Sequence, residues 1–173
     1  SGLTSIIIPD SVIKIDFEAF WGCPIETATM PSYSTISTSE LKVVVLTCGT
    51  SIKDSAFKNC KSLLNITIPN SITSIGKEAF YNCSNLKKIT IPDNVTSIGD
   101  YAFHGCSGLT NVTIPDKVIN IGSHAFYNCN GLTNVTILDR VTNIDSHAFA
   151  YCSRLANITI PNSVKSIGDS AFK

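Results

Sequence analysis

The stretch "IGDYAFHGCSGLTNVTIP", residues 98–115, is written again with few changes as "IGSHAFYNCNGLTNVTIL", residues 121–138. The two copies begin 23 residues apart. Self-similarity at such a period is typical of repeat proteins, in which one small unit cannot bury its apolar side chains alone and is stacked on its neighbours until it can. The period therefore predicts a solenoid, which presents a surface and offers little enclosed volume.

The same period runs along the chain in its phenylalanines and cysteines. The repeated unit reads L-x-x-I-T-I-P-x-S-V-x-x-I-G-x-x-A-F-x-x-C. Because the repeated phrase is cut at both ends of the sequence, we expect a fragment of a longer protein. We predict a single domain, 1–173, composed of units 1–23, 38–60, 61–83, 84–106, 107–129, 130–152 and an incomplete 153–173, with a short irregular copy at 24–37.

Each unit begins with a strand pattern. In "LTNVTIP", residues 109–115, Val112 and Ile114 fall on one side and Asn111 and Thr113 on the other. Alternation of this kind with β-branched residues is typical of a strand with one buried face. The proline that follows ends the strand because it has no amide proton to donate.

The second half of the unit predicts a turn. Gly122 stands where other units carry glycine or aspartate, and both residues tolerate a left-handed backbone, so we expect a sharp turn there. "SHAFYNC", residues 123–129, then fits one helical turn whose Ala125, Phe126 and Cys129 face inward. One unit therefore closes a single coil around its apolar side chains.

Stacking of these coils in register gives an α/β-type repeat solenoid, mostly β with short helical turns. Equivalent strands would lie about 4.7–4.9 Å apart in a parallel sheet. Phe103 would then lie between Phe80 and Phe126 in a continuous apolar column. Burial of one such side chain contributes roughly 1.5–3 kcal/mol, and the sum over neighbouring units stabilises the array.

Composition and motifs exclude several classes of function. Lys plus Arg and Asp plus Glu each number 13, and the chain has no basic run with which to bind nucleic acid or a membrane surface. No apolar run approaches the ~20 residues of a spanning helix, so we expect no membrane insertion. GxSxG, P-loop, HExxH and GxGxxG motifs are absent. We therefore predict neither an enzyme nor a bound cofactor.

The cysteine column allows three interpretations: reduced thiols, disulfides or a metal site. Stacked Cα atoms would fall inside the disulfide range, but parallel side chains hold their Cβ atoms too far apart for relaxed bridging. The chain has no Cys-x-x-Cys pair, so a tetrahedral zinc site has no support. Cysteine also behaves well as a small buried hydrophobe, which favours a reduced column. Cys48 lies off the column.

The histidines raise a second metal question. His124 and His147 occupy the same position in adjacent units and are expected to stack about 5 Å apart on the outer ridge. Two imidazoles could share a metal ion, but no carboxylate holds a third position beside them, so we predict no metal site. His104, beside Tyr81 and Tyr127, is expected to be ordinary surface.

The unit consensus is specific enough to suggest a family. The phrase "IPDNVTSIGDYAFHGC", residues 91–106, resembles the repeat of BspA-like leucine-rich-repeat surface proteins, and the resemblance covers almost the whole chain. It implies a right-handed leucine-rich-repeat coil that is secreted or attached to the cell surface. It also implies an interaction module that binds host matrix proteins or other cells. The alternative is a structural spacer that presents another domain.

Two surfaces are candidates for partner binding. In leucine-rich repeats the sheet side is the usual binding face, which here is a polar ladder of asparagine, threonine and lysine. The rival is a ridge of aromatic residues, since these dominate interface energetics. The sheet-face candidates are Lys87, Lys88, Asn111, Thr113 and Asn134. The ridge carries Trp21, Tyr81, Tyr101, Tyr127 and Tyr151, of which Tyr101 and Tyr127 are the candidates.

Two departures from the repeat lead to further expectations. Units 1–23 and 153–173 lack polar capping sequences, so they should expose apolar groups and favour end-to-end self-association. The short copy at 24–37 lacks the Ala-Phe-x-x-Cys half. We expect it to bend or offset the stack and to hold Tyr33, with Ser32, Ser34 and Thr35, in a protruding loop.

Overall fold

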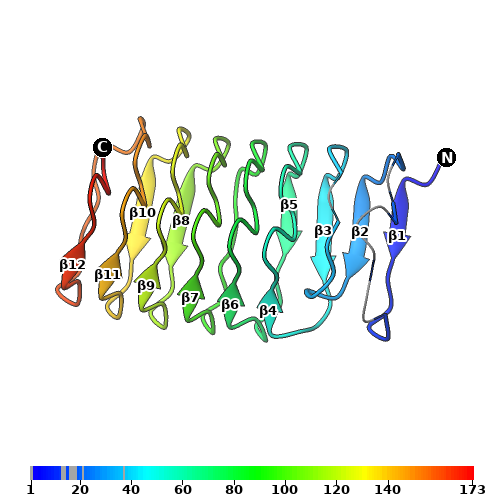
Figure 1. Cartoon of the computed structure of the whole chain (residues 1–173), viewed down its shortest axis with the longest axis horizontal. Coiled ribbons are helices and arrows are strands. Elements are labelled where there is room, and N and C mark those ends of the chain that lie inside the picture. Colours follow the sequence, from blue (N-terminus) through cyan, green and yellow to red (C-terminus); the bar gives the residue numbers. More distant parts are fainter. Residues whose placement is uncertain (1, 13–14, 16–18, 21, 37) are drawn as a thin grey trace.

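The chain forms a parallel β-solenoid. The computed structural model describes residues 2–12, 15, 19–20, 22–36 and 38–173. Successive coils lie side by side along one axis, from the N-terminus at the right of Figure 1 to the C-terminus at the left. Every strand pair in the described residues is parallel, and in most of the stack equivalent residues of neighbouring coils are paired 23 positions apart. The predicted stacking of coils in register is therefore confirmed.

The strands lie in two rows along the stack. The first row, here called the long-strand side, is paired in two blocks, and the second, the short-strand side, is continuous. On the long-strand side, β1 (Ser5–Ile7), β2 (Thr27–Met30), β3 (Val43–Leu46) and β5 (Asn65–Thr67) form one block, and β8 (Asn111–Ile114) and β10 (Asn134–Ile137) the other. The short-strand side contains β4 (Ser51–Ile52), β6 (Ser74–Ile75), β7 (Ser97–Ile98), β9 (Asn120–Ile121), β11 (Asn143–Ile144) and β12 (Ser166–Ile167).

A column of phenylalanine rings occupies the middle of the stack. Phe103 lies 5.1 Å from Phe80 and 5.0 Å from Phe126 between ring centroids, with interplanar angles of 5° and 10°. The column continues through Phe57 at one end and Phe149 at the other. These five rings are almost completely buried. The repeat period thus places each ring against its own counterpart, as the sequence predicts.

The predicted helical turn is wrong, because the described residues contain no helix. In its place, the backbone amides of the turn donate alternately to a carbonyl in the next coil and to a carbonyl in their own coil. The amide of Phe57 donates to the carbonyl of Ala79 in the next coil at 2.8 Å, and that of Lys58 donates to Ser55 within its own coil at 3.1 Å. A helix would direct all of these amides along its own axis, whereas this arrangement pairs half of them with the neighbouring coil.

The residues with a left-handed backbone also differ from the glycine position at which the sequence predicts one. In the coil of Gly122, positive φ occurs at His124 (56°) and Asn128 (58°), and Gly122 itself is not in that region. Gly122 has a different role. A Cβ built on it would lie 2.7 Å from the carbonyl carbon of Gly99, a backbone atom of the preceding coil. A Cβ on Gly122 would therefore press on the backbone of the preceding coil, although Asp145 stands at the equivalent position of the following coil.

The cysteine column has a polar function within the apolar core. The thiol of Cys106 donates to the carbonyl oxygen of Phe80 at 3.1 Å, and Cys129 makes the same contact with Phe103. The equivalent bond recurs at Cys60, Cys83 and Cys152. Burial raises the pKa of the Cys60 and Cys152 thiols to about 11, and the pKa values of the three between them lie well above the usual range. A small apolar side chain with one weak donor suits this position.

Thiol labelling tests this account of the column. Because the reagent must reach the sulfur atom, we expect Ellman's reagent to modify the two half-buried cysteines, Cys23 and Cys48, in the folded protein and all seven only in concentrated guanidinium chloride. The measurement is the absorbance of released thionitrobenzoate with and without denaturant. Fewer than seven reactive thiols after unfolding would indicate disulfides, and rapid labelling of all seven in the folded state would contradict the buried column.

The protruding loop predicted for the short copy is wrong for its two serines, which are buried, whereas Tyr33 is half-buried and Thr35 is exposed. Ser32 is completely buried and Ser34 is 4% exposed. The amide of Ser32 donates to the carbonyl of Cys48, and its hydroxyl donates to the carbonyl of Ser51, each at 2.9 Å. The second bond satisfies a carbonyl of β4, which has no strand partner on that side among the residues that the structure describes. The expected offset is absent from the long-strand side, where β2 pairs in register with both β1 and β3, whereas the expected bend stays a prediction.

Both ends of the stack expose apolar side chains, as expected. Ile7 in β1 is 80% exposed, and Ile167 and Phe172 in the last coil are 51% and 40% exposed. End-to-end self-association of this chain stays a prediction, which light scattering over a range of protein concentrations would test.

Candidate partner-binding surfaces

The long-strand side opens between two neighbouring coils. Residues 88–91 and β8 are joined by a single bridge, Lys88 to Asn111, after which they are not paired as strands. The opening is a groove of about 410 Å³. Its lining combines exposed polar side chains with buried apolar ones. The polar residues are Lys88, Thr90, Asp93, Thr110, Asn111 and Thr113, and the apolar residues are Ile89, Ile91 and Val112.

Three of the sheet-face candidates meet at this groove. Lys88, Asn111 and Thr113 line it, whereas Lys87 is exposed beside it without lining it. Asn134 lines a second opening of about 470 Å³, between β10 and residues 157–159. The sequence identified the exposed residues correctly from strand alternation. It did not predict the openings, because each coil carries the same strand pattern and nothing in that pattern indicates where pairing stops.

The second candidate surface is a ridge formed by the turns, on which tyrosine and histidine rings stack in two columns. In one column His124 lies 4.6 Å from Tyr101 and 4.7 Å from His147. In the other His104 lies 4.5 Å from Tyr81 and 4.9 Å from Tyr127. Tyr151 meets Tyr127 edge-on, with centroids 5.1 Å apart and an interplanar angle of 63°. We call these residues the ring ridge: Tyr81, Tyr101, His104, His124, Tyr127, His147 and Tyr151.

The candidates Tyr101 and Tyr127 therefore lie on the ring ridge and not at the groove. Trp21, the other aromatic residue assigned to this surface, lies outside the described residues. The predicted place of His104 beside Tyr81 and Tyr127 is confirmed, but its assignment to ordinary surface is wrong, because it is an integral member of a column. The signal was available, since Tyr81, His104 and Tyr127 are themselves spaced by the repeat length.

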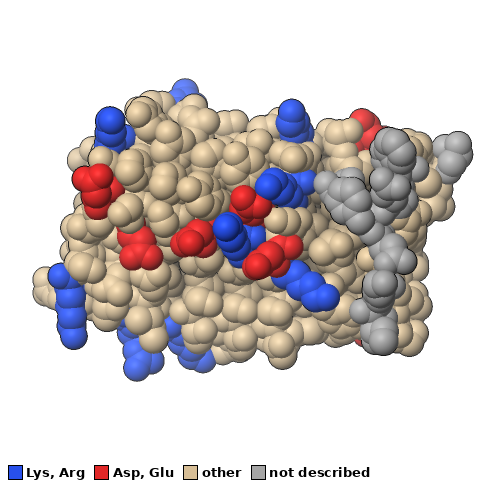
Figure 2. All heavy atoms as spheres, viewed as in Figure 1, with Lys and Arg blue, Asp and Glu red and all other residues tan. Residues whose placement is uncertain are grey.

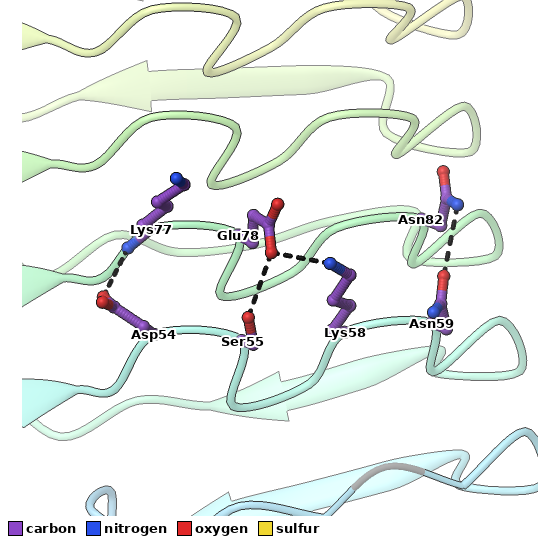
Figure 3. Close-up of polar contacts among 7 residues, drawn as sticks. All are labelled: Asp54, Ser55, Lys58, Asn59, Lys77, Glu78 and Asn82. Atoms are coloured by element: carbon purple, nitrogen blue, oxygen red, sulfur yellow. Dashed lines mark hydrogen bonds and ion pairs between the residues drawn. The ribbon is translucent and has the colours of Figure 1, made fainter.

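Next to the rings, polar contacts join the coils of residues 53–60 and 76–83, and one of them is an ion pair between Lys58 and Glu78 (Figure 3). Glu78 accepts hydrogen bonds from Lys58 at 2.7 Å and Ser55 at 3.2 Å. The bond from Lys58 is the main cause that lowers the pKa of the Glu78 carboxyl. The ammonium of Lys58 also lies 5.0 Å from the ring centroid of Tyr81. In this part of the ridge, the Lys58 ammonium therefore contacts both a carboxylate and an aromatic ring.

Stacking prevents His124 and His147 from sharing a metal ion. Their rings are nearly parallel, 8° apart. Imidazole lone pairs lie in the plane of the ring, so the lone pairs of two parallel rings do not converge on one point. Within the described ranges, no group of three or more His, Cys, Asp or Glu side chains could hold a metal ion.

The histidine columns predict a loss of stability in acid. Burial lowers the pKa values of His104 and His124, and a neighbouring imidazole lowers each further. Because these pKa values lie below the unfolded value of about 6.5, the folded state binds fewer protons than the unfolded state. The free energy of unfolding should therefore be highest above about pH 6.5 and fall as the pH decreases through the folded pKa values.

Urea titrations at about pH 7.5 and about pH 5 measure this difference, with the double variant His104→Gln/His124→Gln as the control. The variant should lose less stability than the parent between the two pH values. An equal loss in both proteins would show that other groups cause the acid sensitivity.

Comparison with known proteins identifies the family. A family model described as a BspA type leucine-rich repeat region, in six copies, matches residues 1–44 and 50–173. The chain therefore belongs to the BspA-type leucine-rich-repeat family, which is typically non-enzymatic. The comparison with curated proteins found no match.

Solved structures of bacterial leucine-rich-repeat proteins share the fold. A leucine-rich-repeat protein from Bacteroides ovatus is 31% identical to this chain, with a TM-score of 0.74. The match covers 97% of this chain and 42% of the Bacteroides ovatus protein. A leucine-rich cell surface protein from Faecalibacterium prausnitzii is 30% identical with a TM-score of 0.72, covering 100% of this chain and 45% of its own. The leucine-rich-repeat protein of T. pallidum is 27% identical with a TM-score of 0.71. This chain thus spans less than half the length of the first two relatives. None of its described residues belongs to a helix that could cross a membrane.

Proposed function

We propose that the chain is a non-enzymatic interaction module, secreted or on the cell surface, that binds a protein partner such as a host matrix or cell-surface protein. The observation that carries the proposal is the groove between residues 88–91 and β8, where Lys88, Asn111 and Thr113 gather around one of the openings in the row of long strands. Exposed amide, hydroxyl and ammonium groups there can bond to a polypeptide, and the buried isoleucines beneath add apolar contact.

A location outside the cell is consistent with the relatives and with the thiol column. One relative is a cell surface protein. Free thiols are unusual in oxidising surroundings, but five of the seven here are buried or nearly so, with raised pKa values, and are therefore poor targets for oxidation.

A binding screen on immobilised matrix glycoproteins tests the proposal. The parent chain should bind at least one of them, and Lys87→Ala/Lys88→Ala should weaken that binding about tenfold, as expected for removal of one charge that lines the groove and one beside it. The control, Lys61→Ala/Lys165→Ala, removes the same charge from exposed residues that do not line the groove. Equal binding by both double variants would remove the groove from the proposal.

The alternative function is a spacer, which the regularity of the stack favours, since side chains such as Asn82 and Asn59 bond mainly to their own counterparts one coil away. Absence of binding to every matrix protein and cell type in the screen would favour this alternative.

A further inference from the structure

The groove between residues 88–91 and β8 has a charged residue at each end. Lys88 is the first residue of the segment and is bridged to Asn111, and Asp93 lies two residues beyond the other end of the segment. Both residues line the groove, and both are exposed. At about 3.3 Å per residue of extended chain, their Cα atoms lie up to roughly 16 Å apart. The groove is therefore cationic at one end and anionic at the other.

These two charges are not used within the chain. In the part of the chain that the structure describes, neither the Lys88 ammonium nor the Asp93 carboxylate forms an ion pair or a hydrogen bond. The ring ridge differs, because the Lys58 ammonium there lies 2.7 Å from the Glu78 carboxylate. Figure 2 shows acidic and basic side chains close together near the middle of one face. A partner of the groove therefore meets free charges and breaks no internal ion pair.

The lining between the two charges suits a polypeptide backbone. Thr90 and Thr113 are exposed, and their hydroxyls have no hydrogen-bond partner among the described residues. A hydroxyl both donates and accepts, so it can bond to either the N–H or the C=O of a peptide group. Beneath them lie three buried apolar side chains, those of Ile89, Ile91 and Val112.

A second opening on the same side provides a comparison. This opening, of about 470 Å³, lies between β10 and residues 157–159, two repeats further along the chain. Asn134 occupies the place that Lys88 has in the first groove. The described residues that line the second opening carry no charge. The two openings thus share a strand pattern and differ in charge.

We propose that the groove between residues 88–91 and β8 binds an extended polypeptide segment with an acidic and a basic side chain about five residues apart. The acidic side chain meets Lys88, the basic side chain meets Asp93, and the backbone between them bonds to the threonine hydroxyls. A nucleic acid carries charge of one sign and would place phosphates beside Asp93. This inference rests on the proposed function, because it names the chemistry of the partner at the same groove.

Chemical shift titration of the isotope-labelled chain with four peptides of equal length tests the proposal. All four have blocked termini and a background of serine and glycine. The first carries glutamate and lysine about five residues apart, and the second has the same composition with the two charges adjacent. The third has glutamine in place of both charges, and the fourth has lysine in both places. The first peptide should bind most tightly and shift the amide signals of residues 88–90 and 111–113. Its binding should weaken between about 50 and 300 mM salt, because the screening length shortens.

Two pairs of variants test the two charges separately. Asp93→Asn should weaken binding of the first peptide about two- to fivefold, the range for one exposed ion pair. Asp116→Asn, at the equivalent exposed position of the next coil, should not weaken it. Lys88→Glu makes both ends of the groove acidic and should change the preference from the first peptide to the fourth. Lys165→Glu makes the same charge change at an exposed residue that does not line the groove and should keep the preference of the parent.

Each outcome bears on the proposal. Equal affinity for the first and third peptides, or for the two charge spacings, overturns it. Shifts confined to residues 134–137 and 157–159, or no shift at about 5 mM peptide, overturn it as well. All four variants alter exposed side chains, and the dispersion of the amide signals establishes that each is folded.

The results also separate this inference from the proposed function. If the peptides show no charge preference while a matrix protein still binds through Lys87 and Lys88, this inference falls and the proposed function stands. If no matrix protein binds but the first peptide shows the expected preference, the binding of matrix proteins falls and the charge selectivity of the groove stands.

Discussion

Replacement of Phe103 by alanine is expected to lower the free energy of unfolding by about 3–5 kcal/mol, the range for large aromatic side chains removed from a packed core. Phe103 is completely buried and contacts a ring on each side, at 5.1 and 5.0 Å. Its loss removes two stacking contacts and leaves a cavity between Phe80 and Phe126. The neighbouring coils cannot close that cavity readily, because their separation is fixed by backbone bonds such as that from Phe103 N–H to the Ala125 carbonyl.

Urea unfolding followed by circular dichroism measures this effect, with Phe172→Ala as the matched control. Phe172 is 40% exposed and stacks on one ring, that of Phe149. Its removal should cost about 1–2 kcal/mol, because less apolar surface returns to water and no enclosed cavity forms. Similar losses for the two variants would mean that Phe103 is not the centre of a continuous column.

The second large effect is expected at Gly122, where alanine should cost about 1–3 kcal/mol through overpacking. The added Cβ would lie within 2.8 Å of the Gly99 carbonyl carbon, the Asp100 nitrogen and the Ile98 oxygen. All three atoms belong to the backbone of the preceding coil, so relief requires movement of a whole coil and not of one side chain. Gly99 and Gly76 make equally close approaches to the coils before them.

Thermal unfolding of Gly122→Ala and of a control, Gly2→Ala, tests this explanation. A Cβ on Gly2 would meet nothing within 4 Å, so that variant should unfold at the parent temperature. An unchanged melting temperature for Gly122→Ala would show that the coils are further apart than described. Lys53 occupies the equivalent place in the unit of residues 38–60, where β4 has no strand partner on that side among the described residues, and Asp145 occupies it in the unit of residues 130–152.

The period made the core predictable from sequence. A residue such as Phe103 recurs at a fixed interval with one chemical character, and stacking of equivalent units places it against its counterparts whatever the detailed path of the coil. The same reasoning correctly placed Val112 and Ile114 inside and Asn111 and Thr113 outside, because strand alternation depends on local geometry alone.

The path of the turn was not predictable in the same way. Ala125, Phe126 and Cys129 have a spacing that fits a helix, and all three are buried. Their amides nevertheless donate hydrogen bonds partly to their own coil and partly to the next coil. A local sequence pattern does not describe contacts with the next coil, so it does not predict this arrangement. Residues such as His124 adopt a left-handed backbone against their intrinsic preference, because those inter-coil bonds fix the chain there.

The candidate surfaces were predicted in composition but not in arrangement. Strand alternation predicted correctly that Lys88 and Asn111 are exposed. The groove beside them arises where strand pairing stops after one bridge, which the alternation does not indicate. Ser32 was misplaced for a related reason. Its polar sequence context suggests a loop, whereas the carbonyl of Ser51 in β4 requires a hydrogen-bond donor, which the buried Ser32 hydroxyl supplies.

The most direct test of coil-on-coil stacking is the set of nuclear Overhauser effects between phenylalanine rings in a protein with protonated phenylalanine and a deuterated background. The account predicts cross-peaks from the ring protons of Phe103 to those of both Phe80 and Phe126, since the centroids lie 5.1 and 5.0 Å away. Absence of cross-peaks from Phe103 to both neighbours in a folded sample would contradict the stacked solenoid and every surface built on it.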